Sequence, residues 1–200
     1  MKAIEFWFSI GSTYTYLSVT RLANVSQKTG ASFSWNPFSV RKIMREMDNI
    51  PFPPTKQVKV EYMWRDIDRR AHNYGFSPSV PAPYPLKEFD LANRVAVLAM
   101  QEGWCEDYVR ETYRLWFVEG YEAGSDYNLT LALSEIGQEK MRVLELANSS
   151  DVEEAYLNQT ENAKRAGIFG SPSFIVDGEL FWGDDRLEDA IAWAKKDGKV

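Results

Sequence analysis

Two short segments at opposite ends of the chain contain the residues that could do chemistry. Ser12 follows a short apolar run and precedes a helical pattern, so it is expected at the N-terminus of a helix. Unpaired N–H groups and the helix dipole stabilise an anion there. A serine hydroxyl at this place can donate a hydrogen bond to a bound thiolate and lower the pKa of that thiol. The alternative is that Ser12 only caps the helix, for which serine is a favoured residue.

The second segment is Ser171-Pro172, at the start of a predicted strand near the C-terminus. A fold can hold an X-Pro bond in the cis form, and a cis bond at this place turns backbone groups toward a neighbouring ligand. That geometry suits the backbone of a peptide-like molecule. Because Pro172 is expected to face Ser12, the thiolate role of Ser12 is favoured over the capping role.

The composition excludes several classes of function. The net charge of -6 argues against nucleic acid as a partner, because phosphate binding needs a basic face. The single cysteine, Cys105, excludes an intramolecular disulfide and a CxxC redox pair, and we expect it to be a structural thiol. With His72 as the only histidine, a zinc site of soft ligands cannot be built, and no metal is predicted. We expect His72 to be a solvated residue on a helix face.

The first residues of the chain enter a predicted strand directly and contain no signal-peptide pattern. No apolar run approaches the length that spans a membrane. We therefore expect a cytoplasmic protein without a membrane partner.

The elements that must position Ser12 begin with a strand–helix–strand unit. Residues 3–9 and Ala31–Asn36 are predicted strands, and a helix from about Thr13 to Thr29 connects them before Gly30. Such a unit implies parallel strands.

The elements that must position Pro172 form a second unit at the C-terminal end. The pattern predicts a helix over Asp151–Ala166, with Ser150 or Asp151 as its N-cap. A hairpin turned by Asp177-Gly178 follows, and a helix over Asp185–Lys196 ends the pattern.

Between the two units lie about a hundred mostly helical residues. The predicted helices are Ser39–Met47, Gln57–Tyr74, Phe89–Glu102, Glu106–Val118, Asn128–Gly137 and Glu139–Asn148. Asp48–Pro54 is predicted to be a loop that cannot be helical, and Phe76–Pro85 is predicted to be extended, because both are rich in proline.

This order of elements predicts an α/β protein with a thioredoxin-like fold and a large all-helical insertion. The thioredoxin-like domain would comprise residues 1–38 and 151–200, and the insertion residues 39–150. A generic α/β sheet with a helical cap is the alternative.

Three segments, Phe6–Leu17, Gly167–Pro172 and Leu180–Leu187, together resemble the family of kappa-class glutathione transferases and 2-hydroxychromene-2-carboxylate isomerases, in the DsbA-like branch of the thioredoxin fold. The resemblance implies glutathione as cofactor and an aromatic or electrophilic small molecule as substrate. It also implies a homodimer.

The resemblance implies roles for individual residues. Ser12 falls on the family's catalytic serine, and the backbone of Ser171, before Pro172, falls on the residue that pairs with the cysteinyl part of glutathione. Asp185 and Arg186 fall on the pair that holds the γ-glutamyl end. The other residues predicted to bind glutathione are Asn49, Lys59, Asp66 and Asp184. The alternative for these charged residues is a solvated surface position or a helix cap.

Aromatic side chains could form the pocket for the acceptor substrate, and could equally belong to the core. They are Tyr14, Phe52, Trp64, Tyr84 and Trp182. Thr13 stands where the family typically has proline, which hints at a subgroup whose substrate need not be the chromene carboxylate.

The leading functional hypothesis is a glutathione-dependent isomerase in which the bound thiolate adds reversibly to an enone-like aromatic substrate. A glutathione transferase that releases the adduct is the alternative that the sequence leaves open. A dithiol oxidoreductase lacks the cysteine pair it would need. A glutathione-binding module without activity is the non-enzymatic alternative.

Overall fold

A mixed four-stranded sheet forms the centre of the computed structural model, which describes residues 1–49 and 54–196. Its strands are β1 (Ile4–Phe8), β2 (Phe33–Pro37), β3 (Ser173–Val176) and β4 (Glu179–Trp182), in the order β2-β1-β3-β4. β1 is parallel to β2 and antiparallel to β3, and β3 pairs with β4 as a hairpin. The predicted strand–helix–strand unit and the C-terminal hairpin are confirmed.

Helix α1 (Thr15–Thr29) connects β1 to β2. It ends where Gly30 adopts φ 74°, a left-handed conformation that glycine takes without strain, and the Gly30 N–H closes the last turn on the Ser26 carbonyl. The helix begins later than the predicted Thr13, because residues 10–14 form turns that carry the chain out of the sheet.

Among the residues that the structure describes, the insertion contains six α-helices, and three helical elements flank the hairpin of the C-terminal unit. The insertion helices are α2 (Val40–Glu46), α3 (Gln57–Asn73), α4 (Phe89–Glu102), α5 (Cys105–Phe117), α6 (Asp126–Glu135) and α7 (Lys140–Ala147). The C-terminal unit has α8 (Ser150–Arg165), a short 3-10 helix η2 (Asp184–Arg186) and α9 (Leu187–Ala194). The predicted helices are thus confirmed, with ends that differ by one or a few residues.

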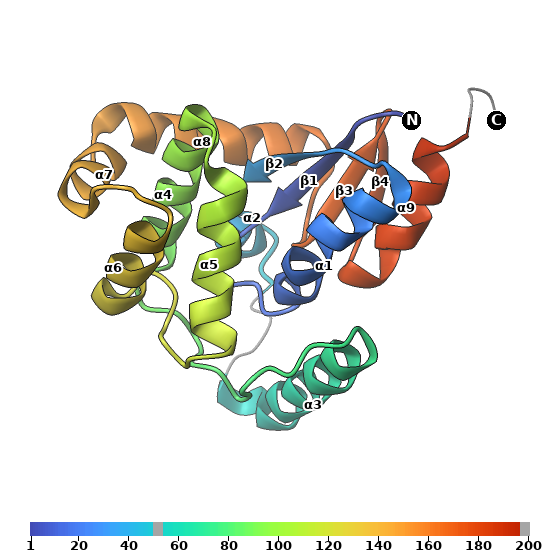
Figure 1. Cartoon of the computed structure of the whole chain (residues 1–200), viewed down its shortest axis with the longest axis horizontal. Coiled ribbons are helices and arrows are strands. Elements are labelled where there is room, and N and C mark those ends of the chain that lie inside the picture. Colours follow the sequence, from blue (N-terminus) through green and yellow to red (C-terminus); the bar gives the residue numbers. More distant parts are fainter. Residues whose placement is uncertain (50–53, 197–200) are drawn as a thin grey trace.

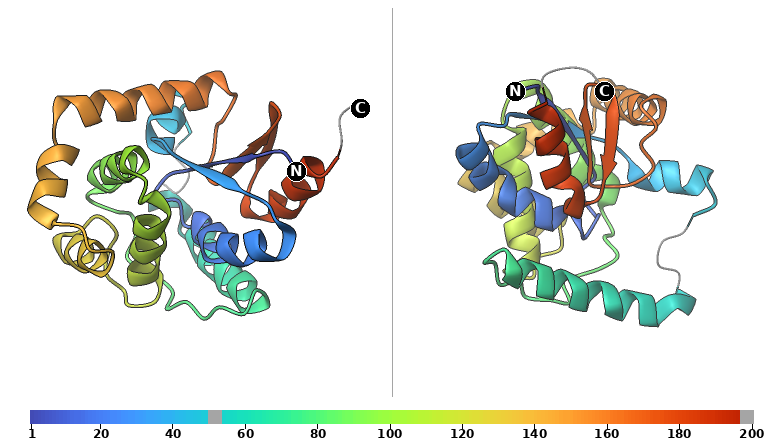
Figure 2. Two further views of the ribbon diagram at one scale, coloured as in Figure 1. Left: turned by 45° about the horizontal axis from the view of Figure 1, so that its top comes forward. Right: turned by 90° about the vertical axis from the view of Figure 1, so that its right-hand side faces the viewer.

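The insertion does not form a single layer. Figure 1 shows α4 to α7 gathered on the left of the sheet, whereas α3 lies apart from them at the bottom. In both views of Figure 2, α3 runs beside α1, and residues of these two helices are in contact. Across the part of the chain that the structure describes, every helix is too short or too polar to cross a membrane.

The core is continuous between the sheet and the insertion. In the sheet, Phe6 of β1 packs edge-on against Trp35 of β2 and stacks on Phe174 of β3. Tyr16 of α1 stacks on Phe117 of α5, with ring centroids 4.2 Å apart. Aromatic pairs of this kind stabilise a fold beyond the area that they bury. The predicted domain limits at residues 38 and 150 stay a prediction.

Two predictions about element ends were wrong. The sequence predicts Pro54 in a loop that cannot be helical, but Pro54–Lys56 forms a 3-10 helix, since proline fits the first position of a helix. The N-cap of α8 is Ser149, whose hydroxyl accepts from the Val152 N–H, and not Ser150 or Asp151. Residues 50–53 of the predicted loop, and with them Phe52, lie outside the described residues.

Candidate functional site

The loop that carries Ser12 is fastened by side chains of the helical insertion. The buried amide of Asn93 in α4 donates to the Ile10 carbonyl at 2.9 Å and accepts from the Ile10 N–H at 2.8 Å. The buried hydroxyl of Tyr113 in α5 lies 3.0 Å from the Ser12 carbonyl and 3.3 Å from the Ser9 carbonyl. These bonds satisfy backbone groups that the strand and the helix leave unpaired, and so they fix the position of Ser12.

Gly11 is required in this loop for two reasons. Its φ is 110°, a value that side chains other than glycine rarely adopt. A Cβ at Gly11 would also lie only 2.5 Å from Cδ2 of Phe89 in α4, a distance at which the ring would have to move. The loop therefore packs directly against the ring of Phe89.

Ser12 and Ser171 are brought together, as the sequence predicted. The Ser12 hydroxyl donates to the Ser171 carbonyl at 2.7 Å, and the Ser171-Pro172 bond is cis. The alternative role of Ser12 as a helix cap is excluded, because α1 begins at Thr15 and the Ser12 hydroxyl is directed at Ser171.

The side chain of Ser171 forms hydrogen bonds within the protein that the sequence did not predict. Its Oγ accepts the Ser9 N–H at 2.9 Å and lies 2.9 Å from the hydroxyl of Thr15. Ser9 directly follows β1, so the Ser171 hydroxyl takes the place of a strand carbonyl where the pairing of β1 with β3 ends. Ser171 and Thr15 thus hold the two sides of the site together.

The predicted charged pair lies on the same side of the site as Pro172. The Gly183 N–H donates to the Pro172 carbonyl at 2.9 Å, which brings η2 next to the Ser171-Pro172 segment. Asp185 and Arg186 of η2 form an ion pair of 2.9 Å, with each side chain about half exposed (50% and 49%). Hydrogen bonding from Arg186 lowers the pKa of Asp185, so its carboxylate is charged and accessible.

Asp184 differs from its neighbour because it is buried. Its carboxylate accepts from Arg70 of α3 at 2.6 Å, and its carbonyl accepts from Arg21 of α1 at 3.0 Å. Burial raises the pKa of Asp184 to about 6, although Arg70 and Arg21 oppose the change. The carboxylate predicted to contact glutathione therefore forms an interior ion pair between η2 and α3.

The pKa values of both partners are raised, which favours the charged form of Arg70 but disfavours the charged form of Asp184. Burial disfavours the charge of Arg70, but hydrogen bonding with Tyr74 and the charge of Asp184 outweigh it and raise the Arg70 pKa, as a favourable pair requires. The raised pKa of Asp184 indicates a net cost instead. The burial of Asp184 outweighs its pairing with Arg70, because the Asp184 side chain is only 2% exposed against 23% for Arg70.

Of the remaining predicted ligands, Asp66 also forms an internal contact. The Tyr14 hydroxyl donates to Asp66 at 3.1 Å, and burial together with the Asp66 charge raises the pKa of Tyr14. This bond connects the start of α1 to α3. Lys59 on α3 and Asn49 after α2 are exposed. The role of these residues in binding glutathione stays a prediction.

The predicted acceptor-pocket rings fall into two groups. The nearly buried ring of Trp64 in α3 packs edge-on against Tyr84, with centroids 6.0 Å apart, and also contacts Phe117. Trp182 at the end of β4 is 54% exposed and packs edge-on against the ring of Phe169. Trp64 thus joins the core, as the alternative interpretation had it, while Trp182 faces solvent.

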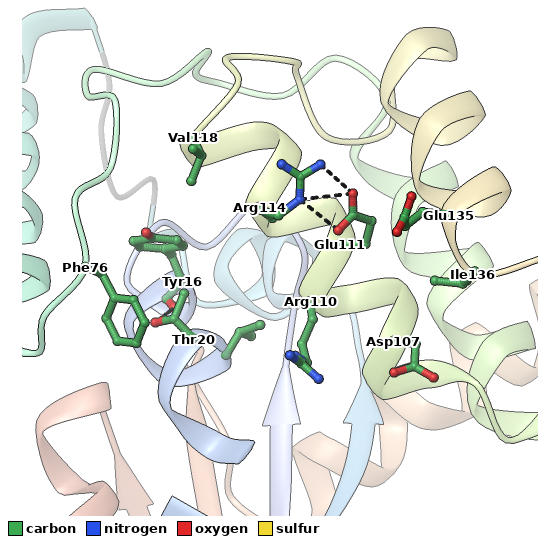
Figure 3. Close-up of a pocket in the computed structure, with 11 residues that line it drawn as sticks. Tyr16, Thr20, Phe76, Asp107, Arg110, Glu111, Arg114, Val118, Glu135 and Ile136 are labelled. Atoms are coloured by element: carbon green, nitrogen blue, oxygen red, sulfur yellow. Dashed lines mark hydrogen bonds and ion pairs between the residues drawn. The ribbon is translucent and has the colours of Figure 1, made fainter. Parts of the chain in front are cut away.

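A cavity of about 610 Å³ lies elsewhere, between α1 and α5. Tyr16, Thr20 and Phe76 form one wall, and Figure 3 shows Arg114 and Glu111 held together by hydrogen bonds on the other. Its lining does not include Ser12 or any other residue predicted for the site. Burial raises the pKa of Tyr16 to about 12, so this phenol stays protonated at neutral pH. The Ser12 hydroxyl therefore lies outside this cavity.

The single cysteine is buried in α5, as expected, and lies 3.6 Å from the Ala96 carbonyl. Burial raises the pKa of the Cys105 thiol, which keeps it protonated and unreactive at neutral pH. His72 is exposed on α3, 3.3 Å from Asp68, which agrees with the expected solvated position.

Four residues that hold the site were missed in the sequence: Thr15, Arg70, Asn93 and Tyr113. Asn93 had a usable signal, because a polar amide inside the apolar pattern of α4 has to find partners in the core. Tyr113 had none, since its sequence neighbours do not indicate which distant carbonyl its hydroxyl meets.

Comparison with known proteins agrees with this description. The 2-hydroxychromene-2-carboxylate isomerase of Sphingobium xenophagum is 26% identical over 190 residues, which cover 94% of this chain and 95% of that protein. The protein of the same name from Pseudomonas putida is 24% identical, covering 92% and 90%. These similarities confirm the resemblance that the segments at the two ends indicate.

Solved structures share the fold. A structure of 2-hydroxychromene-2-carboxylate isomerase superimposes with a TM-score of 0.84 at 24% identity, over 96% of this chain and 95% of that one. A probable DsbA oxidoreductase from Streptomyces coelicolor gives 0.74 at 16% identity, over 100% and 93%. The model of the DSBA-like thioredoxin domain matches residues 3–191, so the chain belongs to the family of DSBA-like thioredoxin domains.

Proposed function

We propose that the protein is a glutathione-dependent isomerase that acts on 2-hydroxychromene-2-carboxylate or a similar aromatic carboxylate. The observation that carries the proposal is the hydroxyl of Ser12, held beside the Ser171 carbonyl in the loop before α1, where a redox relative would carry a cysteine. Relatives along nearly the whole chain bear the name of this isomerase, which supports the reaction class.

The residues around Ser12 fit glutathione by their chemistry. A tripeptide thiol needs a group that stabilises the thiolate, backbone groups for its peptide bonds and charged groups for its ends. Ser12 and Ser171 supply the first two, and the exposed pair of Asp185 and Arg186 lies beyond Pro172 along the same side. Asp185 suits the ammonium of the γ-glutamyl end, and Arg186 suits a carboxylate.

When bound, glutathione would supply a thiolate that adds to the conjugated carbon of the ring-opened substrate and leaves after bond rotation, so that thiol is not consumed. Ser12 has a single hydroxyl proton, which is donated to the Ser171 carbonyl. A thiolate beside Ser12 competes with that carbonyl for the proton, and its negative charge makes it the stronger acceptor. The first turn of α1 adds the positive end of the helix dipole.

Replacing Ser12 tests the proposal. In Ser12→Ala, kcat/KM for isomerisation with glutathione should fall about tenfold to a hundredfold, as expected for a hydrogen bond to a charged group. The pKa of bound glutathione, followed by the ultraviolet absorbance of the thiolate, should rise. Ser149→Ala, which removes a helix-capping hydroxyl far along the chain, is the matched control and should change neither value.

The amount of thiol distinguishes the two reaction types. Turnover that leaves total glutathione unchanged supports the isomerase. Loss of one free thiol per substrate would instead assign a transferase. Wild-type activity in Ser12→Ala, with an unchanged thiol pKa, would contradict the role of Ser12.

A further inference from the structure

The short helix η2, which carries the exposed charged pair, is attached to the rest of the site at its first end through Gly183. The Gly183 N–H donates to the Pro172 carbonyl at 2.9 Å. Asp185 folds back over this glycine, since a Cβ at Gly183 would lie 2.5 Å from Oδ1 of Asp185. This attachment fixes where η2 begins but not its orientation, and a helix of 3 residues is too short to hold an orientation by itself.

A second attachment comes from Arg21 of α1. Its side chain is only 8% exposed, and all three nitrogens of the guanidinium donate hydrogen bonds. Nη2 donates to the Asp184 carbonyl at 3.0 Å, and Nη1 donates to the Glu188 carboxylate of α9 at 2.6 Å. Nε donates to the Leu17 carbonyl at 3.1 Å within α1. Because the directions of these N–H groups are fixed by the planar fork, one side chain holds two segments in a fixed relation.

The guanidinium of Arg21 is itself held in one orientation by the end of α3. Its carbon lies 3.9 Å from the centroid of the ring of Tyr74, the residue that follows α3. Arg70 in the last turn of α3 also donates to the Asp184 carboxylate at 2.6 Å. Stacking on an aromatic face and hydrogen bonds at every nitrogen together restrict the guanidinium to this geometry.

The two points that Arg21 holds lie on either side of the charged pair of Asp185 and Arg186. Asp184 directly precedes the pair, and Glu188 follows it after one further residue. Both bonds lead inward to α1, whereas the side chains of the pair between them are about half exposed. Arg21 therefore presents this pair to solvent at a place that is fixed relative to α1.

The contacts form a closed ring that begins and ends at α1. Ser12 in the loop before α1 donates to the Ser171 carbonyl, and the next residue, Pro172, accepts from the start of η2. Arg21 then connects η2 back to α1. Such a ring fixes the distance between the Ser12 hydroxyl and the charged pair. In the proposed function these groups bind the thiol and the γ-glutamyl end of one molecule, so their separation has to match that molecule.

We propose that Arg21 is a positioning residue that sets the distance between Ser12 and the pair of Asp185 and Arg186. It thereby gives the site its preference for a thiol with a γ-glutamyl group over a shorter thiol. The inference rests on the proposed function, because the distance matters only if glutathione binds with its sulfur at Ser12. Since Arg21 is buried, it acts through η2 and not by contact with the thiol.

The kinetic test compares glutathione with cysteinylglycine, the same thiol without its γ-glutamyl group. In Arg21→Lys, which keeps the charge but loses the fork, the KM for glutathione should rise about tenfold and kcat should change less than about twofold. The KM for cysteinylglycine should change less than about twofold, since that thiol does not reach the charged pair. Arg114→Lys, the same change in an arginine of α5 that forms ion pairs, is the matched control and should leave both values unchanged.

A milder variant guards against a folding defect in Arg21→Lys. Glu188→Gln weakens only the bond between Arg21 and an exposed carboxylate, so this variant should fold normally. It should raise the KM for glutathione about threefold and leave the KM for cysteinylglycine unchanged. An equal rise for both thiols in Arg21→Lys and Glu188→Gln, or no rise in either variant, would overturn the positioning role.

An equilibrium measurement separates this inference from the proposed function. In calorimetry, wild-type protein should bind S-methylglutathione more tightly than S-methylcysteinylglycine, and Arg21→Lys should reduce that difference about tenfold. A difference that Arg21→Lys leaves unchanged would overturn the inference. Selectivity that depends on Arg21, in a protein that does not isomerise the chromene carboxylate, would refute the proposed reaction alone.

Discussion

The hydroxyl of Tyr113 lies 3.0 Å from the carbonyl of Ser12, although 101 residues separate the two along the chain. Tyr113 belongs to α5 in the insertion, and Ser12 follows the first strand of the sheet. The insertion therefore supplies a direct support for the loop that carries the candidate catalytic hydroxyl.

Removing this support should change the activity more than the fold. In Tyr113→Phe, the carbonyls of Ser12 and Ser9 lose a donor in the interior, which should cost about 1 kcal/mol of unfolding free energy. We expect kcat to fall about threefold to tenfold, because the loop becomes less well positioned. Urea unfolding and steady-state kinetics measure the two effects.

Tyr108→Phe is the matched control for this variant. Tyr108 is also buried in α5, but its hydroxyl donates to the Ala92 carbonyl, away from Ser12. It should lose similar stability and keep wild-type kcat. An equal loss of kcat in both variants would mean that α5 acts through general stability and not through Ser12.

Ser171→Ala should destabilise the protein through the backbone amide of Ser9. The Ser9 N–H loses its acceptor and the Thr15 hydroxyl loses its contact with Ser171, and a buried unsatisfied group costs about 1–3 kcal/mol. Since the Ser171 carbonyl remains, the KM for glutathione should change little. Ser173→Ala, which removes a buried hydroxyl bonded to the Gly170 carbonyl, should cost less in the same thermal unfolding experiment. A large rise in KM would instead place the Ser171 hydroxyl on the ligand.

Asp184 should make the stability depend on pH in the weakly acidic range. Burial raises its pKa in the folded state to about 6, whereas the unfolded value is that of an ordinary aspartate near 4. Between these values the folded state binds more protons than the unfolded state, so this residue's contribution to stability decreases as pH rises. The contribution changes by about 3 kcal/mol at most and is constant above the folded pKa.

The measurement is the unfolding free energy of wild type minus that of Asp184→Asn at several pH values. This difference should fall as pH rises from about 4 to about 6 and then stay level. Asp185→Asn serves as control, because hydrogen bonding from Arg186 lowers the pKa of that residue, so its contribution changes only below about pH 4 and should be nearly level between about pH 4 and about pH 6. A difference that increases with pH would show that Arg70 dominates over burial and that the Asp184 pKa is not raised.

Cys105→Ala should leave the activity unchanged. The thiol is buried and its pKa is raised, so it can neither attack a disulfide nor react rapidly with iodoacetamide. Loss of a small buried side chain should cost about 1–2 kcal/mol in unfolding free energy. Disulfide exchange that disappears in Cys105→Ala would revive the oxidoreductase alternative.

Much of the fold could be predicted from the sequence, because its signals are local. The apolar runs at Ile4–Phe8 and Ser173–Val176 and the glycine after Thr29 depend on neighbouring residues only. The position of Ser12 after a strand and of Ser171 before proline could likewise be read in the chain. These two residues lie together because the central strands β1 and β3 are neighbours.

The tertiary structure alone decided which charged side chains face solvent and which form buried ion pairs. Asp184 and Asp185 are adjacent carboxylates of the same type, yet one is buried against Arg70 and the other is exposed beside Arg186. That difference depends on the approach of α3, which contributes Arg70 from a distant part of the chain. The sequence determined the candidate hydroxyl and its place in the fold. The partners that hold it, Asn93 and Tyr113, were decided by packing, because a hydrogen bond between distant residues exists only once the helices have met.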